Sequence, residues 1–175
     1  MPGLVECCMS LSHPPDMSDA VLCALRNSLH NPDCMCLLAL MHLFGNGMEK
    51  NERRAVTFLR KAANEGQAYA PLMLARLKRE SRGGLKKNPV RELALLQQAC
   101  SHGAEVGVAE QAALILAALQ KEADAKHPES CFQYAEVCRK GFFVQQSVER
   151  AAHYYLLAAK AGHYRAQQML SNAGC

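Results

Sequence analysis

The sequence predicts an all-α protein, an α-solenoid of about four stacked antiparallel helix pairs with one irregular insertion. The main observation is an internal repeat, because a skeleton of small residues recurs 96 positions later: Gly45, Ala55, Ala62, Ala63 and Gly66 are matched by Gly141, Ala151, Ala158, Ala159 and Gly162. Such a repeat indicates stacked units rather than one globular core. In addition, no alternating run of strand length stands out, and 50% of the residues are hydrophobic while tryptophan is absent, which suits helix-on-helix packing.

The first clear unit spans about 31–66 and begins with a helix predicted over 33–44. Apolar residues recur there at helical spacing. Asn31 can accept backbone hydrogen bonds as an N-cap, and Pro32 suits the first helical position, where its missing N–H has no partner. Gly45 then ends the helix in a glycine turn, since it can adopt a left-handed conformation.

The second helix of this unit is predicted to begin after an N-cap at Asn51 and to stop at Gly66. Small alanines and the aromatic Phe58 share one face of this helix. Alanines let two helices approach closely while the ring fills the space beyond them.

The last clear unit, about 129–162, repeats this pattern. A helix over 130–140 ends at a glycine turn, Ser147 is the N-cap candidate of the next helix, and a capping helix over about 164–172 follows.

Between the clear units lie a degenerate unit, about 67–103, and an inserted helix, about 105–126. The run 113–119 within this insertion is apolar nearly all round, so we expect it to be buried between neighbouring helices or in a homodimer contact. At the start of the chain, residues 1–16 are interpreted as an irregular arm. A helix over 18–29 would open a single helical-repeat domain that covers residues 17–175.

The order of small residues, aromatic, glycines, Asx and paired alanines resembles the Sel-one-like repeat, a relative of the tetratricopeptide repeat. The residues that match are Cys34, Leu38, Ala39, Gly45, Gly47, Asn51, Ala55, Phe58, Lys61, Ala62, Ala63 and Gly66. In the last unit Phe143 takes the place of the second glycine, and Cys138 stands where the family prefers tyrosine. The resemblance covers about residues 31–172. It implies a bacterial style of protein with roles in regulation, secretion-related assembly or host contact.

The charge pattern is modest overall and concentrated locally. The formal net charge is +4, which does not by itself imply nucleic acid. One helix end and the loop after it carry a basic patch: Arg76, Lys78, Arg79, Arg82, Lys86, Lys87 and Arg91. It is interpreted as a solvated loop facing a helix dipole or, alternatively, as a contact point for an acidic partner. Because no aromatic residue interleaves with these charges, the sequence argues against a platform for single-stranded nucleic acid.

The chain shows no apolar run near the roughly 18 residues that a membrane span needs, and no secretory signal. We therefore expect a cytoplasmic protein, unless a dedicated machine exports it.

The nine cysteines do not form a disulfide framework. Cys131 and Cys138 are about 10 Å apart along one helix, too far for a bridge. We expect reduced thiols that mostly fill buried space, with Cys7, Cys8 and Cys175 exposed. No C-x2-C pair is present, so no metal site and no cofactor are predicted.

No catalytic motif is recognisable: the sequence lacks a nucleophile elbow, a zinc-binding helix motif, a phosphate-binding glycine loop and a dinucleotide fingerprint. We expect no catalytic residues and no enzyme. His102 and His163 flank the glycines that close two units, where a surface or C-cap role is the expectation.

Stacked helix pairs line their inner face with the first helix of each pair. Transferring the register gives a concave protein-binding face that is apolar at one end and charged at the other: Leu40, Leu43, Phe44, Leu77, Glu80, Phe132, Glu136, Arg139 and Lys140. Alternatively, the N-terminal helix or arm covers Leu43 and Phe44. The sequence hypothesis is a non-catalytic adaptor that binds another protein or peptide. A thiol-based redox or metal sensor is the alternative, and a hydrolase is a third possibility.

Overall fold

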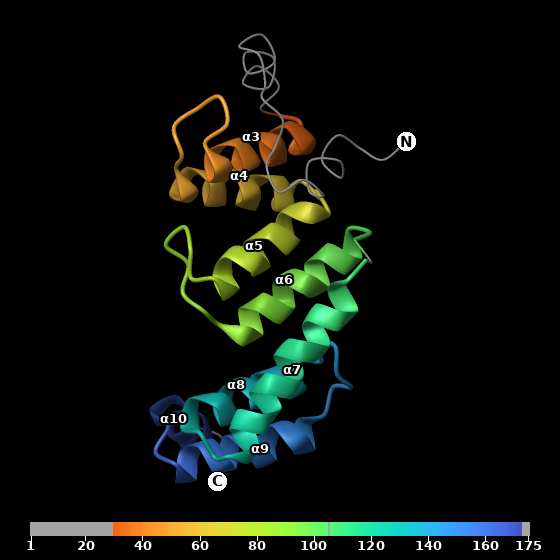
Figure 1. Ribbon diagram of the computed structural model, residues 1–175. Coiled ribbons are helices and arrows are strands. Elements are labelled where there is room, and N and C mark those ends of the chain that lie inside the picture. Colours follow the sequence, from red (N-terminus) through yellow and green to blue (C-terminus); the bar gives the residue numbers. More distant parts are fainter. Residues whose placement is uncertain (1–29, 105, 173–175) are drawn as a thin grey trace. The chain divides into compact units, whose positions relative to one another are not determined.

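The computed structural model describes residues 30–104 and 106–172, and over these residues the chain forms eight α-helices and no strand (Figure 1). The helices are α3 (Pro32–Phe44), α4 (Glu52–Asn64), α5 (Tyr69–Arg79), α6 (Pro89–Ser101), α7 (Val108–Asp124), α8 (Pro128–Lys140), α9 (Val148–Lys160) and α10 (Tyr164–Asn172). The prediction of an all-α solenoid of helix pairs is confirmed. The interpretations of 1–16 as an arm and of 18–29 as a helix lie outside the described residues, as does the prediction for Cys7, Cys8 and Cys175.

The described chain divides into two compact units. An N-terminal unit contains residues 30–88 and 98–104, and a C-terminal unit contains residues 89–97 and 106–172. Helix α6 contributes residues to both units.

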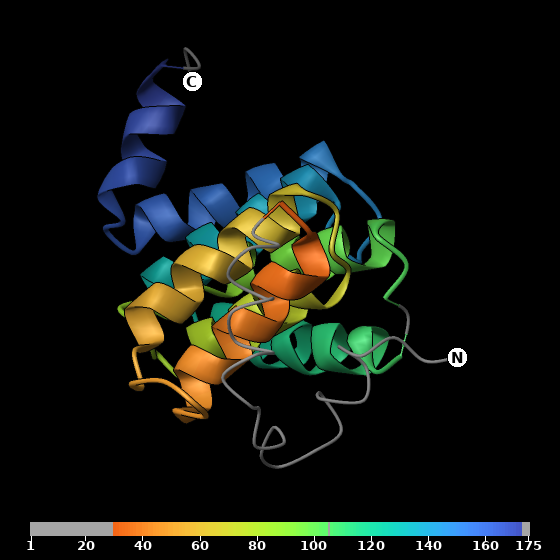
Figure 2. The same ribbon diagram turned by 90° about the horizontal axis from the view of Figure 1, so that it is seen from above.

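In the N-terminal unit, α3 and α4 pack side by side (Figures 1 and 2). The Asn31 Oδ1 atom accepts a hydrogen bond from the Asp33 N–H at 2.9 Å, and the Asn51 Oδ1 atom accepts one from the Arg54 N–H at 3.0 Å. Gly45 ends α3 at φ +79° and donates its N–H to the Met41 carbonyl oxygen at 2.8 Å. The two predicted N-caps and the predicted glycine turn are confirmed.

The loop after α5 is tied back to α4 through one carboxylate. The Glu52 Oε1 atom accepts hydrogen bonds from Nη2 and Nε of Arg82 at 2.6 and 3.0 Å. The Glu52 Oε2 atom accepts the backbone N–H of Gly83 at 3.1 Å. Arg82 in turn pairs with Glu80 at 3.0 Å. Glu52 of α4 therefore anchors Arg82 and Gly83, while backbone hydrogen bonds to α5 hold residues 80–82.

The C-terminal unit repeats the same helix–turn–helix construction in α8 and α9. Gly141 ends α8 at φ +73°, and the Ser147 Oγ atom accepts the N–H of Arg150 at 3.1 Å, as predicted. Helix α7 packs against α8, and α10 packs against α9. The largest fully buried side chain of this unit is that of Tyr134.

Phe143 shows how strictly the repeat imposes its turn geometry. It occupies the register of Gly47, which has a φ of +66°, and it adopts a φ of +55° although it carries a side chain. A left-handed conformation is uncommon for a bulky residue. The turn therefore keeps its left-handed backbone conformation at this position even though a phenylalanine replaces the glycine.

Helix α7 occupies the predicted insertion, but its apolar run is only partly enclosed. Leu119 is buried, whereas Leu114 is 71% exposed. The expected burial of the whole run 113–119 between neighbouring helices is therefore wrong within the described residues. The homodimer contact stays a prediction.

Candidate protein-binding surface

Three of the nine predicted binding residues are core residues. Leu40, Leu43 and Leu77 are 2%, 3% and 2% exposed, because they pack between helices instead of lining an open surface. Phe44, by contrast, is 42% exposed. The expectation that the three leucines form an apolar end of a groove is corrected on this point. The alternative, a covering N-terminal segment, lies outside the described residues.

The charged members of that set are paired within their own helices or loops. Glu80 binds Arg76 and Arg82, both at 3.0 Å. Glu136 pairs with Arg139 at 3.0 Å and with Lys140 at 3.1 Å, and it also accepts a hydrogen bond from the hydroxyl of Tyr155. Burial alone would raise the pKa of Glu136, but the hydrogen bonds from Arg139, Tyr155 and Lys140 outweigh it and lower that pKa to about 2. Glu136 is therefore a structural anion.

The predicted basic patch is not a continuous set of free cations. Arg82 is held by Glu52 and Glu80, and Lys78 is only 9% exposed. Lys86 and Lys87 are exposed. Arg91 belongs to the C-terminal unit, whereas the other six residues belong to the N-terminal one. A binding role for the patch stays a prediction.

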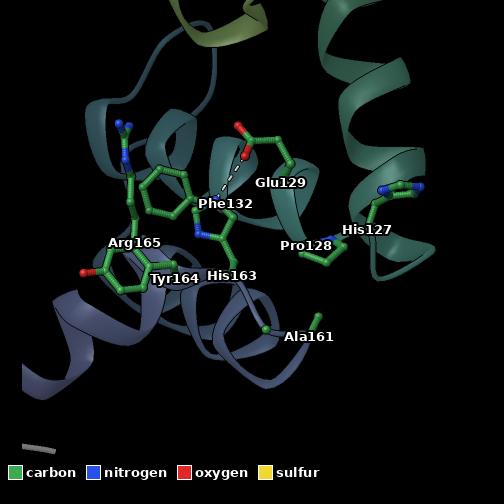
Figure 3. Close-up of a pocket in the computed structure, with 9 residues that line it drawn as sticks. His127, Pro128, Glu129, Phe132, Ala161, His163, Tyr164 and Arg165 are labelled. Atoms are coloured by element: carbon green, nitrogen blue, oxygen red, sulfur yellow. Dashed lines mark hydrogen bonds and ion pairs between the residues drawn. The ribbon is translucent and has the colours of Figure 1, made fainter.

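Phe132, the remaining member of the predicted set, contributes to a pocket of about 490 Å³ in the C-terminal unit (Figure 3). The start of α8, the turn after α9 and the start of α10 form this α8–α10 pocket. The side chains that carry its chemistry are His127, Glu129, Phe132, His163, Tyr164 and Arg165.

Aromatic rings form one wall of the pocket. The Phe132 ring stacks on the His163 imidazole with centroids 4.3 Å apart and an interplanar angle of 17°. The same ring also contacts Tyr155, at a centroid distance of 5.6 Å and an interplanar angle of 60°. Tyr164 is 68% exposed at the rim. Phe132 is therefore held in place by two neighbouring rings, while Tyr164 is open to solvent.

The polar groups of the pocket divide into a bound pair and a free cation. The His163 Nε2 atom lies 3.0 Å from the Glu129 Oε2 atom, and the His163 Nδ1 atom lies 3.2 Å from the backbone nitrogen of Ala166. Because an amide N–H can only donate, Nδ1 is the acceptor, and the proton of the neutral ring is on Nε2, facing Glu129. Arg165 is exposed and pairs with no carboxylate of the described chain.

The sequence pattern did not indicate that Glu129, His163, Tyr164 and Arg165 belong to one site. The expected C-cap role of His163 holds for its backbone, because its N–H donates to the Ala158 carbonyl oxygen at 2.9 Å at the end of α9. The expected surface position is wrong, since its side chain is only 12% exposed and accepts a hydrogen bond at the N-terminal end of α10. A usable signal was the 96-residue register, which relates Glu129 to Asp33 and His163 to Gln67. Once the two units are aligned, side chains that bind backbone groups at equivalent positions can be found from the sequence.

Three of the described thiols, those of Cys36, Cys131 and Cys138, are buried packing residues, whereas Cys34 and Cys100 are partly exposed. Cys34, Cys36, Cys100, Cys131 and Cys138 are free thiols, and no group of three or more potential metal ligands occurs in residues 30–104 and 106–172. Burial raises the pKa of Cys131 and of Cys138. A thiol sensor requires the opposite shift, so these two residues give the sensor alternative no support.

We expect native thiol labelling to distinguish these positions. Cys131 and Cys138 are fully buried, whereas Cys34 and Cys100 are partly exposed. Iodoacetamide followed by peptide mass mapping should modify Cys34 and Cys100 at least about tenfold faster than the buried pair, because the thiolate is the nucleophile and must be accessible. Fast labelling of Cys131 or Cys138 in folded protein would contradict the packing assignment.

No helix in the described part of the chain combines the length and apolarity that crossing a membrane requires.

Comparisons with known proteins agree with the helix-pair construction. The model of the Sel1 repeat matches residues 32–67, 68–103 and 128–163, so the degenerate middle unit is a genuine repeat. An uncharacterized protein of Neisseria meningitidis serogroup B is 29% identical over 171 residues, which cover 90% of this chain and 35% of that protein. Among solved structures, a Sel1 repeat protein from Oxalobacter formigenes is 23% identical with a TM-score of 0.47, over 83% of this chain and 62% of that one.

A protective antigen of uropathogenic Escherichia coli strains, which displays an SLR fold, is 22% identical with a TM-score of 0.43. The match covers 84% of this chain and 34% of the antigen. The chain thus spans less than two thirds of the length of each of these three proteins.

Proposed function

We propose that this chain, which belongs to the Sel1 repeat family, is a non-catalytic scaffold that binds a segment of another protein in the α8–α10 pocket. Sel1 repeat proteins generally mediate protein–protein interactions. The observation that carries the proposal is an aromatic-walled pocket beside an unpaired guanidinium. The register supports it too, because α8 and α10 both follow a unit boundary and occupy the position of first helices, the helices expected to bind partners.

The pocket fits a peptide side chain better than a reaction centre. No serine, cysteine, threonine or lysine is among the residues that line it, and both nitrogens of His163 are engaged. Catalysis requires a nucleophile, a base and an orienting group brought together, whereas here the Glu129 carboxylate and the His163 imidazole are already bound to each other. Tyrosine and arginine at the rim are instead typical anchors of protein interfaces.

The charges of the pocket indicate which kind of peptide segment it would bind. The free Arg165 guanidinium can take a carboxylate in a two-pronged hydrogen bond, whereas Glu129 is already engaged by His163. The partly covered ring of Phe132 and the exposed ring of Tyr164 offer apolar area beside it. The preferred occupant is a peptide segment that places an acidic side chain next to an apolar or aromatic one.

We expect Arg165→Glu to weaken such a peptide by about tenfold or more, since it replaces an attraction with a like-charge repulsion worth about 1.4 kcal/mol or more. Peptides are selected from a random displayed library on the intact protein. Their dissociation constants are then measured by fluorescence anisotropy for the intact protein, Arg165→Glu and Tyr164→Ala. Circular dichroism verifies that each variant is folded.

Lys121→Glu is the matched control. It makes the same change of charge on an exposed side chain of α7 that does not line the pocket, and its affinity should stay within about twofold of the intact protein. Equal weakening by the two charge reversals, or a selection that yields no acidic–apolar peptide, would reject the pocket as the binding site.

A further inference from the structure

The first and last repeat units contain the same side-chain bridge, which we call the clasp. In the first unit, the Gln67 Oε1 atom accepts the Ala70 N–H at 2.7 Å, and the Gln67 Nε2 atom lies 3.5 Å from the Asp33 Oδ1 atom. The bridge in the last unit is made by residues 96 positions later. There the imidazole of His163 replaces the carboxamide, with Ala166 and Glu129 as its two partners.

Each clasp joins the start of the first helix of its repeat unit to the first turn of the helix that follows that unit. Gln67 connects α5 to α3, and His163 connects α10 to α8. Both side chains are largely buried, with Gln67 7% exposed and the His163 side chain 12% exposed. The middle unit has Ala104 in this register and can form no such bridge, because alanine has no polar side-chain atom.

The two clasps differ in one chemical property: an imidazole ring can take up a second proton, whereas a carboxamide cannot. A second proton on the His163 ring must go to Nδ1, the atom that accepts the Ala166 N–H. Protonation therefore replaces a hydrogen bond with two opposed N–H groups and places a positive charge at the N-terminus of α10, where the helix dipole disfavours it.

Other groups around the ring act in both directions. Glu129 of α8 favours the charged imidazole, but its side chain is 65% exposed, so its attraction is weakened by solvent. Arg165 and Tyr164 of α10 and His127 before α8 also line this pocket, and the guanidinium of Arg165 opposes a second positive charge. The Nε2–Glu129 contact can persist after protonation, whereas the Nδ1–Ala166 contact cannot.

We propose that His163 makes the seating of α10 sensitive to pH, so that the clasp is closed around the neutral ring and opens when the ring gains a proton. Because the open form binds one proton more, acidification shifts the equilibrium toward it. Since Phe132, His163, Tyr164 and Arg165 form the pocket, opening also removes the binding geometry. This last consequence rests on the proposed function; the clasp itself does not.

Amide hydrogen exchange of Ala166 measures the clasp without any partner. After correction for the intrinsic exchange rate, its protection should fall at least about tenfold between pH 8 and pH 5.5 in the intact protein. His163→Gln copies the first clasp of this same chain, so its protection should remain within about twofold. The Ala70 amide of the glutamine clasp is the internal control and should not change. A flat Ala166 profile in the intact protein, or the same fall in His163→Gln, would overturn the proposal.

A second measurement tests the link to the pocket. The selected peptide should bind the intact protein about tenfold more weakly at pH 5.5 than at pH 8, and His163→Gln, measured with the same peptide, corrects for titration of the peptide itself. Equal pH dependence in the two proteins would overturn the link. If no peptide binds at either pH, the proposed function fails, while the Ala166 exchange still decides the clasp.

Discussion

Replacing Gly83 with alanine should lower the unfolding free energy of the N-terminal unit by about 3 kcal/mol, the largest stability loss that we expect from a single methyl group here. Gly83 has a φ of +62°, and a Cβ atom at this position would lie 2.6 Å from the Val56 Cγ2 atom and 3.0 Å from the Glu52 backbone oxygen. Val56 is buried and β-branched within α4, so its methyl group cannot rotate away. The loop itself would have to move.

Movement of this loop also breaks its anchoring hydrogen bonds. The Gly83 N–H donates to Glu52, and the neighbouring Arg82 donates to the other oxygen of the same carboxylate. Hydrogen bonding from Arg82 lowers the pKa of Glu52, which shows that the native loop favours the charged carboxylate. A displaced loop would leave this charge with fewer donors, and that loss adds to the steric one.

Gly84→Ala provides the matched control for this experiment. Gly84 also has a positive φ, +77°, but the nearest heavy atom to its added Cβ would be Arg53 Nε at 3.9 Å. Only the cost of the left-handed conformation remains, about 1 kcal/mol. Urea denaturation followed by circular dichroism should therefore separate the two variants by about 2 kcal/mol. Equal losses of unfolding free energy in the two variants would show that the close contact between Gly83 and α4 does not constrain the loop.

The sequence alone located the caps and turns because these are local. Asn31, Asn51 and Ser147 each bond to a backbone N–H two or three residues away, and Gly45 and Gly141 adopt the left-handed conformation that ends a helix. A local pattern is sufficient for such interactions. No local pattern separates Gly83 from Gly84, because only the packed structure brings α4 against the first of them.

The binding face was harder to predict because the repeat alignment does not show which apolar residues are buried between helices and which are exposed. Helix α3 buries eight of its thirteen residues, including Leu40 and Leu43, so it has hardly any free face. On α8, by comparison, Phe132 is only partly covered and reaches the pocket. The residues that complete this pocket come from the turn after α9 and the start of α10, so their contribution depends on how α10 packs against α9.

The hydrogen bonds of Glu136 should give the C-terminal unit a strongly acid-sensitive stability. Its carboxylate is only 15% exposed and is held by Arg139, Lys140 and the hydroxyl of Tyr155. Tyr155 is itself buried, and burial together with this hydrogen bond raises the pKa of Tyr155 to about 12. The network thus joins α8 to α9 through a charged carboxylate and a neutral phenol.

The folded-state pKa of Glu136, about 2, lies below its ordinary value of 4.5. A lowered pKa contributes stability that is complete above the ordinary value and is lost as pH falls through the folded one. We therefore expect about 2 kcal/mol of unfolding free energy to disappear between about pH 5 and pH 2. Glu136→Gln should lose a similar amount at pH 7, because a neutral amide cannot replace the charge-assisted bonds, and should lack this part of the acid dependence.

Urea denaturation of the intact protein and the variant at pH 6, 4 and 3 measures this difference directly. Glu110→Gln serves as the control, since that exposed carboxylate in the first turn of α7 has no ion-pair partner in the described chain. Its stability should follow the intact protein at all three pH values. If Glu136→Gln also follows the intact protein down to pH 3, the Glu136 network does not hold α8 and α9 together, and other carboxylates must account for the acid sensitivity.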